Sequence, residues 1–322
     1  MVRSTEEMTP GDHVCAFPVS DEQLWEISAE FVAAGLARNE QVYYFDDGTA
    51  SSVLGRLADD RVPLAQPLRT GQLAIVPSDV TRQVFRTPVA AVQQMFAERI
   101  EASVAEGYAG LRITGQMSYG AARPVGIGLT EYDAGLDAVV RGRPAIALCL
   151  YDRRRYTDAQ IEEMRDVHRD ELSAPSAYDD GLLRITRTGL TTARMAGEVD
   201  HSNRPMITRL LETTLDDALR SHSASTDIEL NLASLRFMDV AGAVSLVHAA
   251  EAFPSTHRLV LTGVRPRIVR VLDRCGAPFA AQLSVREFEP ERDRLPLVIT
   301  ADTRDDVLVD AFGSTEPLRE AR

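Results

Sequence analysis

Hydrophobic residues follow two different periods along most of this chain. Short runs that are apolar at nearly every position, such as Val42–Phe45 and Ala145–Leu150, predict strands buried on both faces. Between such runs, apolar residues recur three or four positions apart, as from Leu24 to Ala34, and predict helices with one buried face. Strands that alternate with helices of this length indicate an α/β fold with a mainly parallel sheet.

The first half of the chain predicts a three-layer α/β domain. Its strands are expected at 13–17, 42–45, 72–76, 111–114 and 145–150. Ser20 with Gln23 and Thr157 with Gln160 have the spacing of helix-capping boxes. Thr87 and Pro88 are expected to open a long helix, with the proline at its first position.

The second half predicts a smaller α/β domain. Strands are expected at 182–186, 192–196, 228–232 and 258–262, with helices from Pro205, from Asp239 and from Pro266. Small, polar residues around Pro175 indicate a linker between the two halves. We therefore divide the chain into a first domain (8–172), a linker (173–180), a second domain (181–288) and a weakly ordered acidic tail (289–322).

The stretch from Thr226 to Ser245 predicts a strand, a loop and the start of a helix. Asp239 occupies the position of a helix N-cap, and small residues follow it. Gly242 allows the helix to begin close to the sheet. A helix N-terminus presents free backbone N–H groups, so this corner is a candidate docking surface.

This stretch resembles the core of the STAS domain, the fold of anti-sigma factor antagonists, over about Gly181 to Val285. The family pattern of Asp, a small residue, a phosphorylatable Ser or Thr, and Gly matches Asp239, Val240, Ala241 and Gly242. The resemblance implies that these four residues bind an anti-sigma factor or a related regulatory kinase. Because Ala241 cannot carry phosphate, we expect binding that phosphorylation does not release. The alternative is a scaffold or dimerisation unit, which leaves a homodimer open.

Three blocks in the first half resemble the MEDS sensory domain, over roughly residues 8 to 170. They are Gly11–Cys15, Leu111–Tyr119 and Leu148–Tyr156. The resemblance implies a degenerate RecA-like fold that senses small organic molecules. The chain departs from the family at several positions, with Gln116 in place of Glu and Tyr119 in place of Trp.

Composition narrows the function further. The formal net charge of −13 disfavours direct binding of nucleic acid. The chain contains no lysine, which excludes a phosphate-binding P-loop and lysine-based catalysis. No apolar run reaches the roughly 20 residues of a membrane span, and the N-terminus lacks a secretory pattern. With three cysteines, an odd number, we expect free thiols and a cytoplasmic protein.

His13 and Cys15 point to one face of a predicted strand, because they lie two residues apart. One interpretation is a pocket lined by His and Cys that binds a small organic ligand or a soft metal. The other is that the thiols are core residues and that His13 bonds the backbone. The candidate ligand-binding residues are His13, Cys15, Gln116, Tyr119, Cys149 and His168.

These candidates lack the spacing that identifies a metal site, so we predict neither a metal nor another cofactor. We also find no intact set of catalytic residues in the sequence. The sequence therefore predicts a non-catalytic regulator in which the first domain senses a small molecule or a partner and the second binds a protein. The alternative is a weak enzyme that binds or hydrolyses nucleotides on the RecA-like first domain.

Overall fold

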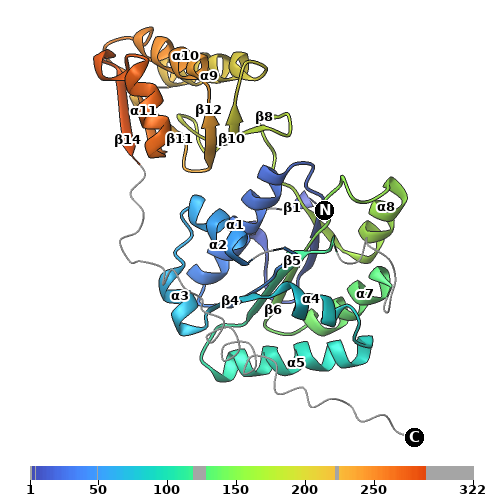
Figure 1. The fold of residues 1–322 in the computed structure, drawn as a ribbon. Coiled ribbons are helices and arrows are strands. Elements are labelled where there is room, and N and C mark those ends of the chain that lie inside the picture. Colours follow the sequence, from blue (N-terminus) through green and yellow to red (C-terminus); the bar gives the residue numbers. More distant parts are fainter. Residues whose placement is uncertain (1, 4, 49, 119–127, 222–224, 288–322) are drawn as a thin grey trace, which may run out of the picture.

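The computed structural model describes residues 2–3, 5–48, 50–118, 128–221 and 225–287. These residues form two β-sheets, each with its own helices, and the chain completes the first before it enters the second (Figure 1). The predicted acidic tail lies outside the described residues. Among the described residues, no helix combines the length and apolar character needed to cross a membrane.

The first sheet is parallel throughout, in the order β1-β7-β2-β6-β5-β3-β4 among the described strands. Its strands are β1 (Val2–Arg3), β2 (His13–Ala16), β3 (Gln41–Phe45), β4 (Leu73–Val76), β5 (Leu111–Gln116), β6 (Ala145–Leu150) and β7 (Asp170–Leu172). Alternate residues of β2 face opposite ways: Cys15 joins one apolar cluster, and Val14 and Ala16 join another. The sheet is therefore buried on both faces.

Helices cover both faces of this sheet. The helices of one face are α1 (Asp21–Ala37), α2 (Ala50–Asp59) and α3 (Ala65–Thr70), while those of the other are α4 (Ser78–Val84), α5 (Val89–Ala105), α7 (Leu129–Val140) and α8 (Asp158–Val167). A short 3-10 helix, η1 (Thr5–Glu7), lies beside α1. This arrangement confirms the predicted α/β class with three layers and a parallel sheet.

The second sheet is mixed, in the order β14-β13-β11-β10-β9-β8 among the described strands, with β12 paired to β10. Its strands are β8 (Tyr178–Asp179), β9 (Leu183–Arg187), β10 (Thr192–Val199), β11 (Asp227–Asn231), β12 (Leu235–Met238), β13 (Arg258–Val264) and β14 (Leu283–Glu287). Its helices are α9 (Arg204–Arg220), α10 (Val240–Glu251), α11 (Pro266–Arg274) and the 3-10 helix η2 (Ala277–Phe279).

One face of the second sheet packs on α9, α10 and α11 in a single apolar cluster. The opposite face carries Arg184 on β9, which is buried, and Arg194 on β10, whose side chain is 11% exposed. Their neighbours Leu183, Ile185 and Ala193 point into the apolar cluster instead, as the two-residue period of a strand requires. The second face of this sheet is thus polar and needs charged partners.

The predicted start of one helix was wrong by one residue. The helix α5 begins at Val89 with Pro88 as its N-cap, and the hydroxyl of Thr87 does not cap it but donates to the carbonyl of Gln83 at 2.9 Å. The strand β8 lies inside the range 173–180, where the sequence indicated only a linker. The division of the chain into the ranges given above stays a prediction.

Candidate functional site

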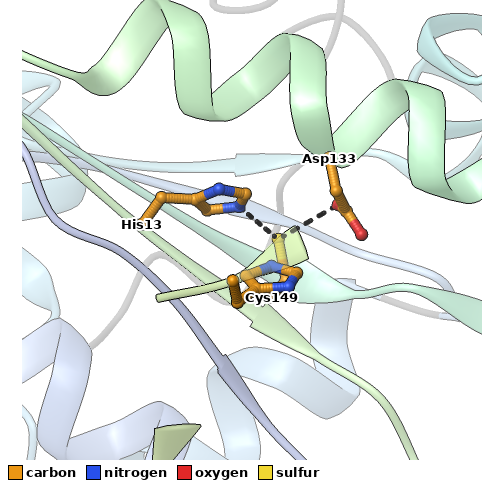
Figure 2. Close-up of side chains that lie close together, drawn as sticks. His13, Asp133 and Cys149 are labelled. Carbon is orange, nitrogen blue, oxygen red and sulfur yellow. Dashed lines mark hydrogen bonds between the residues drawn. The ribbon is translucent and has the colours of Figure 1, made fainter. Parts of the chain in front are cut away.

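Four buried side chains with metal-ligating atoms meet between the first sheet and its helices α7 and α8. His13 begins β2, Cys149 lies on β6, Asp133 on α7, and His168 caps the C-terminus of α8. The Nε2 atom of His13 lies 3.4 Å from Sγ of Cys149, which lies 3.7 Å from Oδ1 of Asp133. Figure 2 shows the thiol of Cys149 between the imidazole of His13 and the carboxyl of Asp133. We call these four residues the His–Cys–Asp cluster.

His168 is the fourth member of the cluster, and its ring lies beside the ring of His13. The two imidazole centroids are 4.3 Å apart. The Nδ1 atom of His168 bonds the carbonyl of Met164 at 2.7 Å, so the proton sits on Nδ1 and Nε2 carries the lone pair. That Nε2 atom is buried and has no hydrogen-bond partner among the described residues.

Burial disfavours the charged form of every side chain in the cluster. Burial and the neighbouring His168 hold the pKa of His13 well below its usual value, and burial lowers the pKa of His168. Burial also raises the pKa of the Cys149 thiol well above its usual value. The pKa of the Asp133 carboxyl rises to about 7 through burial, although the hydroxyl of Tyr151 donates to it and opposes the rise. A protonated thiol is a poor nucleophile, so Cys149 in this state is unsuited to covalent catalysis.

The second candidate site is the corner between β12 and α10. The side chain of Asp239 accepts a hydrogen bond from the backbone N–H of Gly242 at 2.6 Å, which is N-cap geometry as predicted. A Cβ added at Gly242 would lie 2.6 Å from Val199 on β10, so only glycine lets α10 start this close to the sheet. Two apolar side chains remain exposed here, Phe237 at 48% and Val240 at 65%.

The hydroxyls near Ala241 have other partners. Ser245 donates to the carbonyl of Ala241 at 2.8 Å. Ser234 is buried and donates to the carboxylate of Asp60 in the first domain at 2.7 Å. Both hydroxyls are therefore hydrogen-bonded elsewhere, and neither replaces the hydroxyl that Ala241 lacks.

Comparison with known families decides what the two halves are. Residues 12–169 match the MEDS family, described as the methanogen/methylotroph DcmR sensory domain, and residues 184–286 match the STAS domain. The chain contains a MEDS domain followed by a STAS domain. Both resemblances seen in the sequence are thereby confirmed, and a sensory domain joined to a STAS domain supports a role in signalling.

Solved structures give a weaker likeness. The flagellar accessory protein FlaH from Methanocaldococcus jannaschii is 10% identical with a TM-score of 0.42, covering 58% of this chain and 79% of its own. A KaiC-like protein from Pyrococcus horikoshii OT3 is 14% identical with a TM-score of 0.40, covering 61% of this chain and 89% of its own. No curated protein matches the chain.

The structure brings three of the six predicted ligand residues of the MEDS domain together: His13, Cys149 and His168. Cys15 lies directly opposite Cys149 in the sheet, but its thiol donates to the carbonyl of Asp170 at 3.7 Å. Gln116 pairs in register with Leu150, whereas Cys149 pairs with Gly115, so Gln116 faces the other side of the sheet. Tyr119 lies outside the described residues.

Sequence reasoning missed Asp133. It lies in α7 among buried apolar residues, and its own side chain is fully buried. A carboxylate on the apolar stripe of a predicted helix is a usable signal, because an ionised group is seldom buried without a partner. The partners here are Tyr151 and Cys149, both brought by β6 and the residue that follows it.

Ion pairs join the polar face of the STAS sheet to α1 and α2 of the MEDS domain. Glu26 of α1 accepts from Arg184 at 2.5 Å and lies 3.5 Å from Arg194. Arg194 also donates to Asp60, which follows α2, from Nε at 2.9 Å. These charged side chains are nearly inaccessible to solvent, with Arg184 at 1% and Glu26 at 5%.

The same interface reaches the β12–α10 corner. Glu22 of α1 accepts from Arg236 of β12 at 2.5 Å, and Arg56 of α2 lies 2.7 Å from the other oxygen of Glu22. Arg236 is the residue before Phe237 and three residues before Asp239. The MEDS helix α1 thus holds the strand that leads into the candidate docking corner.

Proposed function

We propose that this chain is a non-catalytic signalling regulator whose STAS domain binds an anti-sigma factor or a related regulatory kinase. In this proposal the MEDS domain senses a small molecule at the His–Cys–Asp cluster and controls that binding. The observation that supports it most concerns the corner between β12 and α10 in the STAS domain. There the exposed side chains of Phe237 and Val240 lie next to the N-terminus of α10, whose first N–H groups have no partner within the helix.

The chemistry of the corner suits a protein partner. Phe237 and Val240 offer apolar area that a partner can remove from water. The positive end of the α10 dipole, next to them, favours an acidic or polar group on the partner. The thiol of Cys275, at the C-terminus of α11, donates to the carbonyl of Val240 at 3.7 Å, so α11 contacts the same corner.

The interface between the domains supplies a physical route for control. Arg236 of β12 is bonded to Glu22 at the N-terminal end of α1 in the MEDS domain. A shift of α1 on ligand binding would break or move this pair and so change the orientation of β12. The partner-binding corner follows directly on that strand, so its affinity for the partner would change with it.

Phosphorylation at the STAS loop has no role in this proposal. A phosphate at position 241 would place about two negative charges within the corner and oppose docking. Ala241 offers no oxygen for it, and Ser234 is buried against Asp60. The STAS domain would then stay competent to bind, and the signal would enter through the MEDS domain.

The test measures binding of the purified full chain to each purified anti-sigma factor kinase encoded by the native host. We expect Val240→Glu to weaken the binding at least tenfold, because it places a charge on an apolar contact. Leu219→Glu is the matched control, since Leu219 on α9 is also exposed, at 54%. Equal affinity of both variants for every kinase, or no binding by the wild-type chain, would refute the proposal.

A further inference from the structure

The donor atoms of the His–Cys–Asp cluster are arranged as a metal site. One ligand atom from each of His13, Asp133, Cys149 and His168 lies within 4.8 Å of every other. Four ligands around a tetrahedral zinc ion, at roughly 2.0–2.3 Å from it, lie about 3.5 Å from one another. The distances from Sγ of Cys149 to Nε2 of His13 and to Oδ1 of Asp133 are 3.4 and 3.7 Å.

The buried nitrogens give a second, independent observation. Nε2 of His168 has no hydrogen-bond partner among the described residues, although the side chain is only 6% exposed. An unpaired polar atom at this depth destabilises the fold unless something binds it. The other ring nitrogen, Nδ1, is bonded to the Met164 carbonyl, which is how proteins orient a histidine toward a metal.

The remaining ligands are held differently. Nδ1 of His13 has no hydrogen-bond partner among the described residues, and the carboxylate oxygen of Asp137 lies 4.0 Å from it. The hydroxyl of Tyr151 donates to the oxygen of Asp133 that does not face Cys149. Nε2 of His13, Sγ of Cys149 and Oδ1 of Asp133 therefore remain next to one another, as ligands of a single ion would be.

We propose that the MEDS domain binds one divalent transition-metal ion, of the zinc type, through His13, Asp133, Cys149 and His168. Two imidazoles and a thiolate select zinc, cobalt or copper over magnesium and calcium, which prefer oxygen ligands. The ion would neutralise the thiolate and carboxylate that burial otherwise disfavours. The inference names the ligand class of the sensory domain and so rests on the proposed function, but its test uses the protein alone.

The experiment titrates Co²⁺ into the metal-depleted full-length protein and follows its absorption spectrum. We expect one equivalent to produce the visible bands of tetrahedral cobalt together with a cobalt–thiolate charge-transfer band. Cys149→Ser should abolish the charge-transfer band. Cys15→Ser is the matched control and should keep it, because that thiol faces the carbonyl of Asp170 instead. His168→Gln should weaken Co²⁺ binding at least tenfold.

Two results would overturn the inference: no thiolate band in the wild-type protein, or a band of equal strength after Cys149→Ser. If Cys149→Ser does not fold, X-ray absorption of the zinc-loaded wild-type protein decides the point. It should give one sulfur at about 2.3 Å and three nitrogen or oxygen atoms at about 2.0–2.2 Å. A shell without sulfur would contradict the assignment. A failure here leaves partner binding at Val240 as a separate question, so the two proposals can fail independently.

Discussion

Replacing Arg194 by alanine tests whether the buried ion pairs hold the MEDS and STAS domains together. Its guanidinium donates to Asp60 at 2.9 and 2.5 Å and to Ser234 at 3.0 Å, and the side chain is only 11% exposed. Removing one partner of a buried pair destabilises a protein by roughly 3–5 kcal/mol. In the variant, Asp60 still accepts a hydrogen bond from Ser234, and Glu26 still accepts one from Arg184. We therefore expect the free energy of unfolding to fall by about 3 kcal/mol, the lower end of that range.

Denaturant unfolding of the full chain gives the measurement. Trp25, the only tryptophan, lies on α1 of the MEDS domain, so its fluorescence reports that domain while circular dichroism reports both. In the wild-type protein the two transitions should coincide, and Arg194→Ala should separate them. Arg220→Ala is the control, because the pair of Arg220 with Asp216 is exposed and contributes less than about 1 kcal/mol.

A double-mutant cycle assigns the effect to the contact itself. Arg194→Ala combined with Asp60→Ala should show a coupling free energy of about 1–3 kcal/mol. The reasoning is wrong if Arg194→Ala loses no more stability than Arg220→Ala, or if the two transitions stay together in it. Either result would mean that the polar face of the STAS sheet does not depend on the MEDS domain.

Three further predictions concern stability and access. Gly242→Ala should destabilise the STAS domain by about 1–3 kcal/mol, because the new Cβ would lie 2.6 Å from Val199. Gly55→Ala is the comparison: its Cβ would have no atom within 4 Å, so it should stabilise helix α2 by up to about 1 kcal/mol. Chemical denaturation measures both changes. Limited proteolysis should cut first at 175–177, which is exposed, and a first cut inside either domain would count against the linker. Magnesium-ATP at millimolar concentration should leave the melting temperature unchanged, whereas a clear rise would favour the nucleotide-binding alternative.

The sequence predicted most of the elements whose signal is local. Strands such as β6 are nearly continuous apolar runs, and the N-caps Ser20, Thr157 and Asp239 act within three residues of themselves. The strand β12 was missed because it is four residues long and half of it is exposed or partly exposed. The short strands β7 and β8 were missed since they are polar and take their structure from neighbours in the sheets.

The candidate site was only partly predictable, because its contacts are remote in sequence. His13 and Cys149 are 136 residues apart, and the sequence around each residue does not predict that they are in contact. Asp133 reaches Cys149 only because α7 packs on that face of the sheet. Gln116 was grouped with them because it ends a neighbouring strand, but one residue of register places it on the opposite face.

Hydrogen–deuterium exchange tests the central claim of partner binding most directly. The backbone N–H groups of Val240 and Ala241 lie in the first turn of α10, so they exchange quickly in the free protein. In a complex with a purified anti-sigma factor kinase, the account predicts strong slowing of exchange at Val240 and Ala241. Slowed exchange elsewhere on the chain, with unchanged rates at these two residues, would contradict it.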